Sequence, residues 1–242
     1  MKRTWTRARG LAVTAAVPVL LLASAGAGAV VSAGGDDSHR AGHDGTAAIP
    51  APDSADAGFA RDMAVHHQQA VEMSFIVRDR TQDEEVRGLA YDIVNTQANQ
   101  RGMLLGWLDL WGLPKVASGT VPMAWMTSGR SEGHGDHEDH EDHEDHEDPG
   151  GHQIREGSPM PGMATRTELE QLAKASGKQA EVLFLQLMTT HHKGGIAMAR
   201  GCTDLCSVPQ EKALARKMLD AQKAETHLMV DMLRQRNSAP QH

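Results

Sequence analysis

Residues 59–73, with the sequence FARDMAVHHQQAVEM, decide how this chain is organised, because their pattern occurs twice. The second copy, FLQLMTTHHKGGIAM, occupies residues 184–198, at an offset of 125 positions. This offset carries a Phe, a Met, two adjacent His and a second Met onto identical residue types. The chain therefore contains a duplicated unit with a fixed arrangement of thioether and imidazole groups.

In both copies the key residues follow one another at steps of four and three, which is the spacing of one face of an α-helix. A helix face that carries Phe and Met is expected to point into a core, so imidazoles and thioethers are predicted to turn inward together. The first stripe consists of Phe59, Met63, His66, Ala70, Met73 and Val77, and the second of Phe184, Met188, His191, Gly195, Met198 and Cys202.

Helix-start and helix-stop signals place the first motif in a hairpin of two helices. The first helix is predicted from Asp53 or Ser54 to about Arg80. The capping-box pattern of residues 81–84 then opens a second helix, which reaches Trp111 before a Gly-Leu-Pro stop.

The second half of the chain repeats this arrangement. A capping box at residues 165–168 opens a short helix that breaks near Gly177, and the second motif helix follows and is expected to end at Gly201. Residues 207–210 start a last helix that reaches about Arg236. The last helix matches the second one at the same offset, in that Gln97 maps to Gln222, Gln100 to Glu225 and Leu108 to Leu233.

These elements predict an all-α fold, a ferritin-like four-helix bundle made of two duplicated helix hairpins with a long disordered crossover loop. The bundle domain is expected over residues 53–236, interrupted by a loop at 116–164 that is rich in Met, His, Asp and Glu. Residues 34–52, rich in Gly, Ala, Asp and Pro, are predicted to form a flexible linker.

The first 33 residues have the form of an export segment, with a basic start, an apolar run at 11–23 and small residues after it. A cleaved signal peptide and an uncleaved N-terminal membrane anchor both fit, because the apolar and small stretch is about as long as a bilayer is thick. In either case the remainder is expected outside the cytoplasm, with the membrane contacted only through such an anchor.

The net charge of −8 does not indicate a basic partner, and it is concentrated in one tract. Residues 136–148 hold nine Asp or Glu and no Lys or Arg. Because the chain has no basic stripe with interleaved aromatic residues, nucleic acid is excluded as a partner.

The two stripes offer the ligands of a soft ion. Thioether sulfur combined with imidazole nitrogen suits Cu(I) or Ag(I) and offers little to Mg or Ca. Burying two adjacent imidazoles twice is costly unless they bind a partner. The predicted metal ligands are Met63, His66, His67, Met73, Met188, His191, His192 and Met198.

Two other metal chemistries of helical proteins do not fit. A carboxylate-bridged di-iron bundle needs Glu-x-x-His motifs, and no Glu stands three positions before His66, His67, His191 or His192. The His-Glu-x-x-His motif of zinc proteases is also absent.

The loop carries further candidate ligands of lower specificity. Its acidic tract repeats His at every third position, and imidazoles among carboxylates can bind Cu(II) or Zn loosely even in a chain without fixed structure. The secondary candidates are Met123, Met126, Met160, Met163, His134, His137, His140, His143 and His146. Cys202 and Cys206 leave two readings open, a local disulfide or a thiolate that Cys202 lends to a metal.

The doubled motif resembles the bacterial domain-of-unknown-function 305 family. The likeness rests on residues 62–73 and 188–198, on Gln97, on Trp107-Leu108 and on Met160-x-x-Met163, and it covers about residues 53–236. It implies a ferritin-like helical bundle, usually exported, with some members tied to copper or silver binding and resistance. The same eight Met and His residues are the positions to which it points.

The sequence therefore favours a non-catalytic, extracytoplasmic copper-binding protein that sequesters Cu(I) or hands it to a chaperone or acceptor protein. Metal ions are its expected partners. A structural or interaction bundle without metal and a metal-dependent oxidoreductase are the alternatives.

Overall fold

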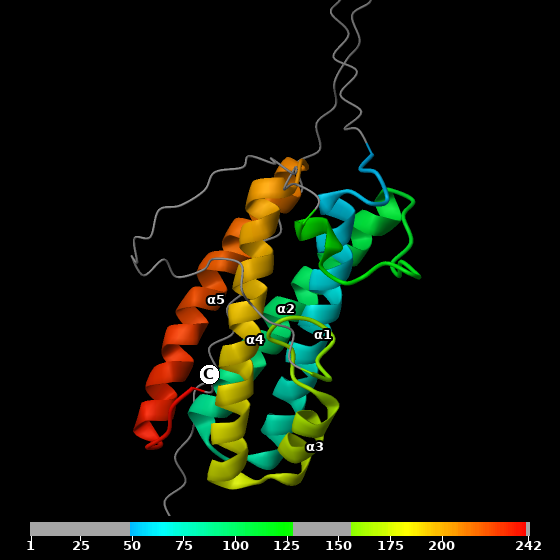
Figure 1. The fold of residues 1–242 in the computed structure, drawn as a ribbon. Helices are drawn as coiled ribbons and strands as arrows, with labels where there is room; N and C mark the ends of the chain where they lie inside the picture. Colours follow the sequence, from blue (N-terminus) through cyan, green and yellow to red (C-terminus); the bar gives the residue numbers. More distant parts are fainter. Residues whose placement is uncertain (1–48, 128–155, 241–242) are drawn as a thin grey trace, which may run out of the picture. The chain divides into compact units, whose positions relative to one another are not determined.

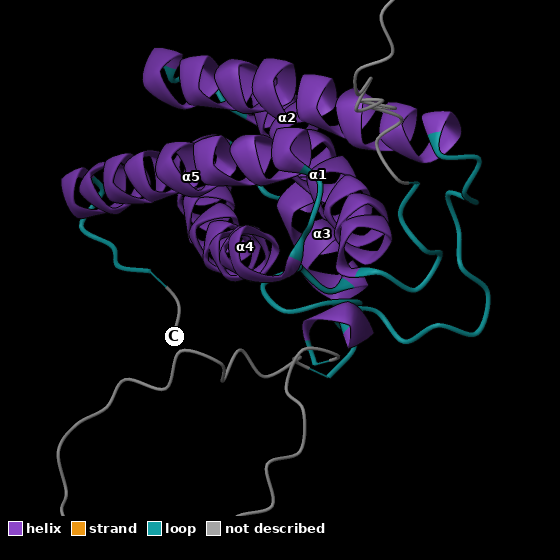
Figure 2. Ribbon diagram, turned by 90° about the horizontal axis from the view of Figure 1, so that it is seen from above, coloured by secondary structure: helices purple, strands orange, loops and turns teal. Residues whose placement is uncertain are grey.

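The computed structural model describes residues 49–127 and 156–240 of the chain. The predicted export segment, most of the predicted linker and the His/acid tract lie outside the described residues. The described elements are α1 (Ala55–Arg80), α2 (Glu84–Leu110), the short 3-10 helix η1 (Ala124–Met126), α3 (Arg166–Lys174), α4 (Gly177–Leu205) and α5 (Pro209–Gln235). Figure 2 shows that the described secondary structure is entirely helical.

The helix ends reproduce the duplication seen in the sequence. α1 ends at Arg80 and α4 at Leu205, which are 125 positions apart. The starts of α2 and α5 and their ends are separated by the same interval. The two hairpins, α1–α2 and α4–α5, are therefore copies of one unit.

The two helices that carry the motifs form the centre of the bundle. α1 and α4 pack against each other in opposite directions, α2 packs on α1, and α5 packs on α4 (Figure 1). Because α2 and α4 run in the same direction, the crossover between the hairpins must return along the length of the bundle. The predicted ferritin-like four-helix bundle is confirmed, with α3 as an additional short helix beside α1.

Side-chain caps explain where most helices begin. Ser54 Oγ accepts from the Ala57 amide at 3.2 Å, and Thr165 with Glu168 forms the predicted capping box of α3. The capping box predicted at residues 81–84 is wrong, because the cap of α2 is Asp83, whose Oδ1 accepts from the Val86 amide at 2.9 Å. Thr81 instead follows the end of α1 and donates its hydroxyl to Glu181 at 2.6 Å.

The predicted end of the second motif helix at Gly201 is also wrong. α4 continues to Leu205, and Gly201 lies inside it against the side chains of Trp125 and Met126. A Cβ at Gly201 would come within 2.9 Å of Met126 Cε, so this glycine makes room for η1 rather than ending the helix.

Two side chains of α1 hold the described ends of the crossover onto the bundle. Asp62 accepts from the Met123 amide at 2.7 Å and from Trp125 Nε1 at 2.9 Å. Gln69 exchanges two hydrogen bonds with the backbone of Ala164, at 2.9 and 2.7 Å. Asp62 stands about one turn before the His pair of α1 and Gln69 about half a turn after it, so both anchors hold the crossover to the motif segment of α1.

Close backbone contact seats the later part of the crossover on α4. Gly162 has a φ of 79°, and its Cα lies against Gly194. A Cβ at Gly194 would lie 2.2 Å from the carbonyl oxygen of Pro161, far inside van der Waals contact. Only glycine at position 194 allows residues 160–163 to lie this close to α4.

We predict that Gly194→Ala destabilises the protein by about 1–3 kcal/mol, because the crossover backbone must move away from α4. The matched control is Gly102→Ala in α2, where a Cβ meets no atom within 4 Å. That change is expected to stabilise by up to about 1 kcal/mol, since alanine favours the helix. Urea unfolding of both variants measures the difference, and equal effects would show that the contact at Gly194 is unimportant.

Candidate metal centre

The eight residues predicted as ligands all lie in the interior of the bundle. Every residue of both stripes is buried, and the four His side chains are 0% exposed. The prediction that both stripes face inward is therefore confirmed. α1 and α4 supply two adjacent His each, at the point where these helices cross.

The four imidazoles form one layer across the centre of the bundle. The rings of His66 and His191 face each other with their centroids 3.7 Å apart and their planes at 32°. His67 and His192 lie to the sides, with ring centroids 6.5 Å from His66 and 6.4 Å from His191, respectively. The two copies of the motif thus meet in a single layer of four His, which we call the His layer.

The His layer has very few hydrogen bonds. Seven of its eight ring nitrogens are buried and have no hydrogen-bond partner in the described part of the chain. The exception is His192 Nε2, which lies 2.5 Å from Oε2 of Glu225 on α5. Buried polar atoms without partners cost about 1–3 kcal/mol each, so this layer needs a ligand or solvent to complete it.

Burial keeps at least three of these imidazoles neutral. Burial is the main cause that holds the pKa of His66 and of His191 well below the usual value, and the neighbouring imidazoles add to it. Burial also lowers the pKa of His67 to about 3. The amides of Gln100 and Gln97 oppose this last shift, although neither reaches hydrogen-bonding geometry with His67. A metal binds neutral imidazole, so these rings are ready to act as ligands at mildly acidic pH.

The thioethers lie in pairs on either side of the His layer. Because α1 and α4 run in opposite directions, Met63 belongs to the same apolar cluster as Met198. Met73 belongs with Met188 to the cluster at the opposite end of the bundle. All four side chains are 0% exposed. The layer of nitrogen donors therefore lies between two pairs of sulfur donors.

The secondary candidates divide into three groups. Met160 and Met163 are almost fully buried in the segment that docks on α4 beside Thr190 and Gly194, at the level of the His layer. Met123 and Met126 are only partly buried and flank Trp125 near Gly201, about 14 Å along α4 from His192. His134, His137, His140, His143 and His146 lie outside the described residues.

Several polar residues that border the His layer were not among the predicted site residues. Glu225 pairs with His192, and Gln97 and Gln222 are buried with unpaired amide atoms. Gln222 approaches α4 so closely that a Cβ at Gly195 would lie 2.3 Å from its Oε1. The sequence could have indicated these residues, because the offset of 125 positions matches Gln97 with Gln222 and Gln100 with Glu225.

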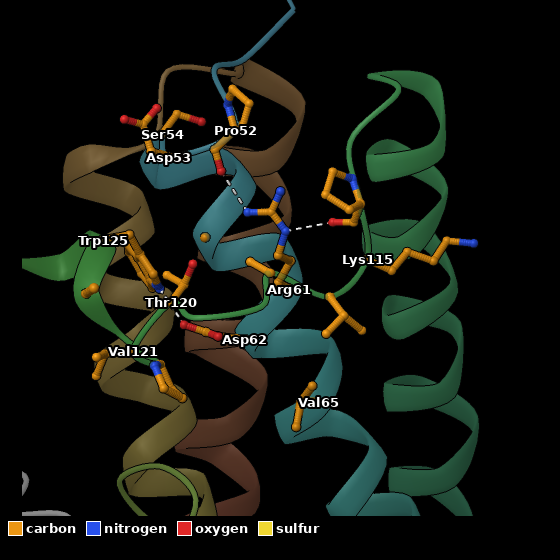
Figure 3. Close-up of a pocket in the computed structure, with 16 residues that line it drawn as sticks. Pro52, Asp53, Ser54, Arg61, Asp62, Val65, Lys115, Thr120, Val121 and Trp125 are labelled. Carbon is orange, nitrogen blue, oxygen red and sulfur yellow. Dashed lines mark hydrogen bonds between the residues drawn. The ribbon is translucent and has the colours of Figure 1, made fainter.

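A separate pocket of about 460 Å³ opens on another face of α1, between that helix and residues 114–125 (Figure 3). Arg61 supports its wall by donating to the carbonyl oxygens of Pro114 and Pro52, at 2.7 and 2.8 Å. Burial raises the pKa of Asp62, which also lines it. None of the eight predicted metal ligands lines this pocket, so it is distinct from the His layer.

Comparison with known proteins identifies the family. The model of the domain of unknown function DUF305 matches residues 56–233, which include both motifs and the crossover. The chain belongs to the DUF305 family. No curated protein matches it.

Solved structures agree with the DUF305 assignment. A DUF305 protein from Streptomyces coelicolor, which is predicted to be secreted, is 54% identical, with a TM-score of 0.65 over 79% of this chain and 99% of that one. A DUF305 fragment from Deinococcus radiodurans is 27% identical, with a TM-score of 0.52 over 72% and 92% of the two chains. CopM in a Cu(I)-bound form shares the fold at 18% identity, with a TM-score of 0.50 over 74% and 96%.

The neutral imidazoles predict how the stability of the metal-free protein depends on pH. In the unfolded chain each His binds a proton near pH 6.5, whereas His66, His67 and His191 do not when folded. These three groups make the unfolded state bind more protons below about pH 6.5, and their contribution to the free energy of unfolding should fall as the pH drops from about 6.5 to about 5. Glu211, whose pKa burial raises to about 9, contributes in the opposite direction over the same range. Each such proton contributes at most about 1.4 kcal/mol per pH unit.

Urea unfolding across this pH range, with metal removed, measures the effect. The control is the double variant His66→Leu with His191→Leu, in which two of the three groups cannot titrate while Glu211 and the other acids are unchanged. Its loss of stability on acidification should be smaller than that of the parent. Identical pH profiles for the two proteins would contradict the assignment of neutral, buried imidazoles.

Proposed function

We propose that this protein binds Cu(I), and Ag(I) as its chemical analogue, at the His layer. The role we assign is extracytoplasmic sequestration or delivery of the ion to a chaperone or acceptor protein, without catalysis. The observation that supports this proposal most strongly is that seven buried, unpartnered imidazole nitrogens lie between two pairs of buried thioethers. A soft cation bound to these nitrogen and sulfur atoms would supply the bonding partner that the ring nitrogens lack.

The composition of the layer supports a soft monovalent ion over a hard one. Imidazole and thioether donors favour Cu(I), whereas Mg, Ca and di-iron centres require several oxygen ligands. Glu225 is the carboxylate that contacts an imidazole of the layer, and it occupies the outer side of His192. A carboxylate hydrogen-bonded to one ring nitrogen orients that imidazole and leaves the other nitrogen free to bind a metal.

Two related structures agree with this proposal, which rests on the geometry of the His layer and not on them. CopM, which shares the fold, has been solved with Cu(I). The Streptomyces coelicolor relative is predicted to be secreted, in keeping with an extracytoplasmic location here. In residues 49–127 and 156–240, no helix combines the length and apolar character that crossing a bilayer requires.

We assign a weaker gathering role to the acidic tract of the crossover. Imidazoles in water titrate near pH 6.5, so a tract of His and carboxylates would take up Cu(II) or Zn at neutral pH and release it on acidification. The His layer differs because burial lowers the pKa of His66, His67 and His191, and because thioethers do not titrate.

The first prediction of this proposal separates metal binding from packing. His66→Leu with His191→Leu should weaken Cu(I) binding by at least tenfold, measured by competition with a chromophoric Cu(I) chelator. The same variant should be no less stable than the metal-free parent, because leucine leaves no unpaired buried nitrogen. The matched control is His227→Leu at an exposed position of α5. A destabilised variant that keeps its Cu(I) affinity would show that these histidines serve packing alone.

A second prediction concerns the thioethers. Met63→Leu with Met198→Leu conserves volume and apolar character, so the fold should be kept within about 1.5 kcal/mol while Cu(I) affinity falls. Met103→Leu, at a side chain that is 42% exposed on α2, is the control. Unchanged Cu(I) affinity in the core variant would exclude sulfur from this side of the layer.

The third prediction assigns different ions to the two regions. Deletion of residues 134–148 should remove weak uptake of Cu(II) or Zn that is lost on acidification, and should leave tight Cu(I) binding intact. Replacing Met63, His66, Met188 and His191 together should do the opposite. Chelator titrations in each oxidation state measure both, and loss of Cu(I) binding on deletion of the tract alone would make the bundle only a scaffold.

A further inference from the structure

A second group of metal-binding side chains lies at the turn between α4 and α5. Cys202 and Cys206 end α4, Glu211 stands in the first turn of α5, and all three are buried. One ligand atom from each residue lies within 4.8 Å of the other two. The two cysteines are joined as a disulfide, so in this state their sulfurs are not available as thiolates.

The duplicated hairpin shows that the fold does not need these residues. Subtracting 125 from their positions leads to Val77, Thr81 and Val86 in the first hairpin. That hairpin makes the same turn between the same helix ends. At one end of the bundle the second hairpin therefore has two cysteines and a glutamate where the first hairpin has two valines and a threonine.

The disulfide contributes little to holding the chain together. It links residues four positions apart at the end of one helix. A cross-link that closes so short a loop removes little conformational entropy from the unfolded chain, because the stabilisation by a disulfide increases with the length of the loop it closes. A structural role therefore does not account for the two cysteines.

Glu211 is costly in its present surroundings. Its side chain is 0% exposed, and neither carboxylate oxygen has a hydrogen-bond partner in the described part of the chain. Burial raises its pKa to about 9, and the nearby carboxylate of Asp56 adds to the shift. The amides and hydroxyl at Ser207 and Val208 donate to Asp56 and not to Glu211.

The other end of the bundle satisfies its buried acid differently. There Arg236 donates to Glu181 at 2.9 Å and pairs with Asp83 at 2.8 Å, while Thr81 donates to Glu181. In the first hairpin Asp56 occupies the position that matches Glu181, and Trp111 the position that matches Arg236. The cation that pairs with Glu181 therefore has no counterpart for Asp56, the carboxylate that neighbours Glu211. A bound cation would supply the charge that this end of the bundle lacks.

We propose that reduction of the Cys202–Cys206 disulfide creates a second metal site, in which both thiolates and the Glu211 carboxylate bind Zn(II). A dithiol reductant donates two electrons and two protons, becomes a disulfide itself, and leaves two protein thiols. Zn(II) then displaces the thiol protons and the proton of Glu211. The disulfide and the bound metal exclude each other, so the redox state decides whether the site exists.

The ligand set fits this ion. Structural zinc sites combine cysteine thiolates with nitrogen or carboxylate ligands, and the three negative ligands here would be drawn together by a divalent charge. The trio lies about 16 Å along α4 from His191, so it is separate from the His layer. The proposal therefore does not depend on Cu(I) binding there.

The test compares the oxidised and the phosphine-reduced full chain in Zn(II) titrations against a chromophoric chelator. Zinc that binds to other histidines is present in both states, so the readout is the increment on reduction. We expect one additional Zn(II) per chain, with release of protons detected by an indicator dye. The increment should remain in the His66→Leu, His191→Leu background, which separates this proposal from the proposed function.

One double variant, whose residues are taken from the chain's own first hairpin, keeps the test clear of misfolding. Cys202→Val with Cys206→Thr restores the residues of that hairpin, so it should fold and show no increment. Glu211→Gln should weaken the additional site at least tenfold, while Glu170→Gln at an exposed position of α3 should not. Absence of an increment in the reduced parent, uptake of Cu(I) but not of Zn(II), or full affinity in Glu211→Gln would each overturn the proposal.

Discussion

The structure depends on the packing of four buried imidazoles where α1 and α4 cross. His66 and His191 face each other at 3.7 Å, a separation that two charged rings could not keep in a dry interior. Burial drives their pKa values down, and this keeps them neutral. Apolar clusters pack on both sides of the layer, so its unpaired nitrogens find no partner among the described residues.

The remaining features of the centre follow from that constraint. α5 must come close enough to place Gln222 and Glu225 beside α4, which requires glycine at position 195. Residues 161–162 of the crossover lie against α4 at Gly194. Gln69 holds Ala164, and Asp62 holds Met123 and Trp125, from the same helix that carries His66. The predicted ligands of α1 and the residues that anchor the crossover thus occupy neighbouring turns of this helix.

The two hairpins share a scaffold but not their chemistry. Gln100 stands beside His67 where Glu225 stands beside His192, so the two sides of the His layer differ in charge. The turn regions differ as well, since Glu181 is paired with Arg236, while Glu211 lies beside a disulfide and pairs with no cation among the described residues. The fold does not require a particular residue at matched positions where the two hairpins differ, so residues such as Glu211 and Glu225 can serve binding instead.

The sequence by itself determined the helices, the duplication and the inward faces. Residues spaced by three and four must share one side of a helix, and a constant offset of 125 must relate equivalent turns, whatever the tertiary structure. The eight Met and His residues that the same reasoning selected as ligands are all in the core. It failed at Thr81 and Gly201, because capping signals are local and both residues serve contacts with other elements.

Only the tertiary structure decided how these residues meet. The antiparallel crossing of α1 and α4 places Met63 and Met198 in one apolar cluster and Met73 and Met188 in the other. It also brings two His pairs that are distant in sequence into one layer. It also separates Met160 and Met163, at the level of the layer, from Met123 and Met126 near Gly201. Helical spacing fixes which face a side chain occupies, but the partner across the interface depends on the direction and depth of packing, which no local pattern encodes.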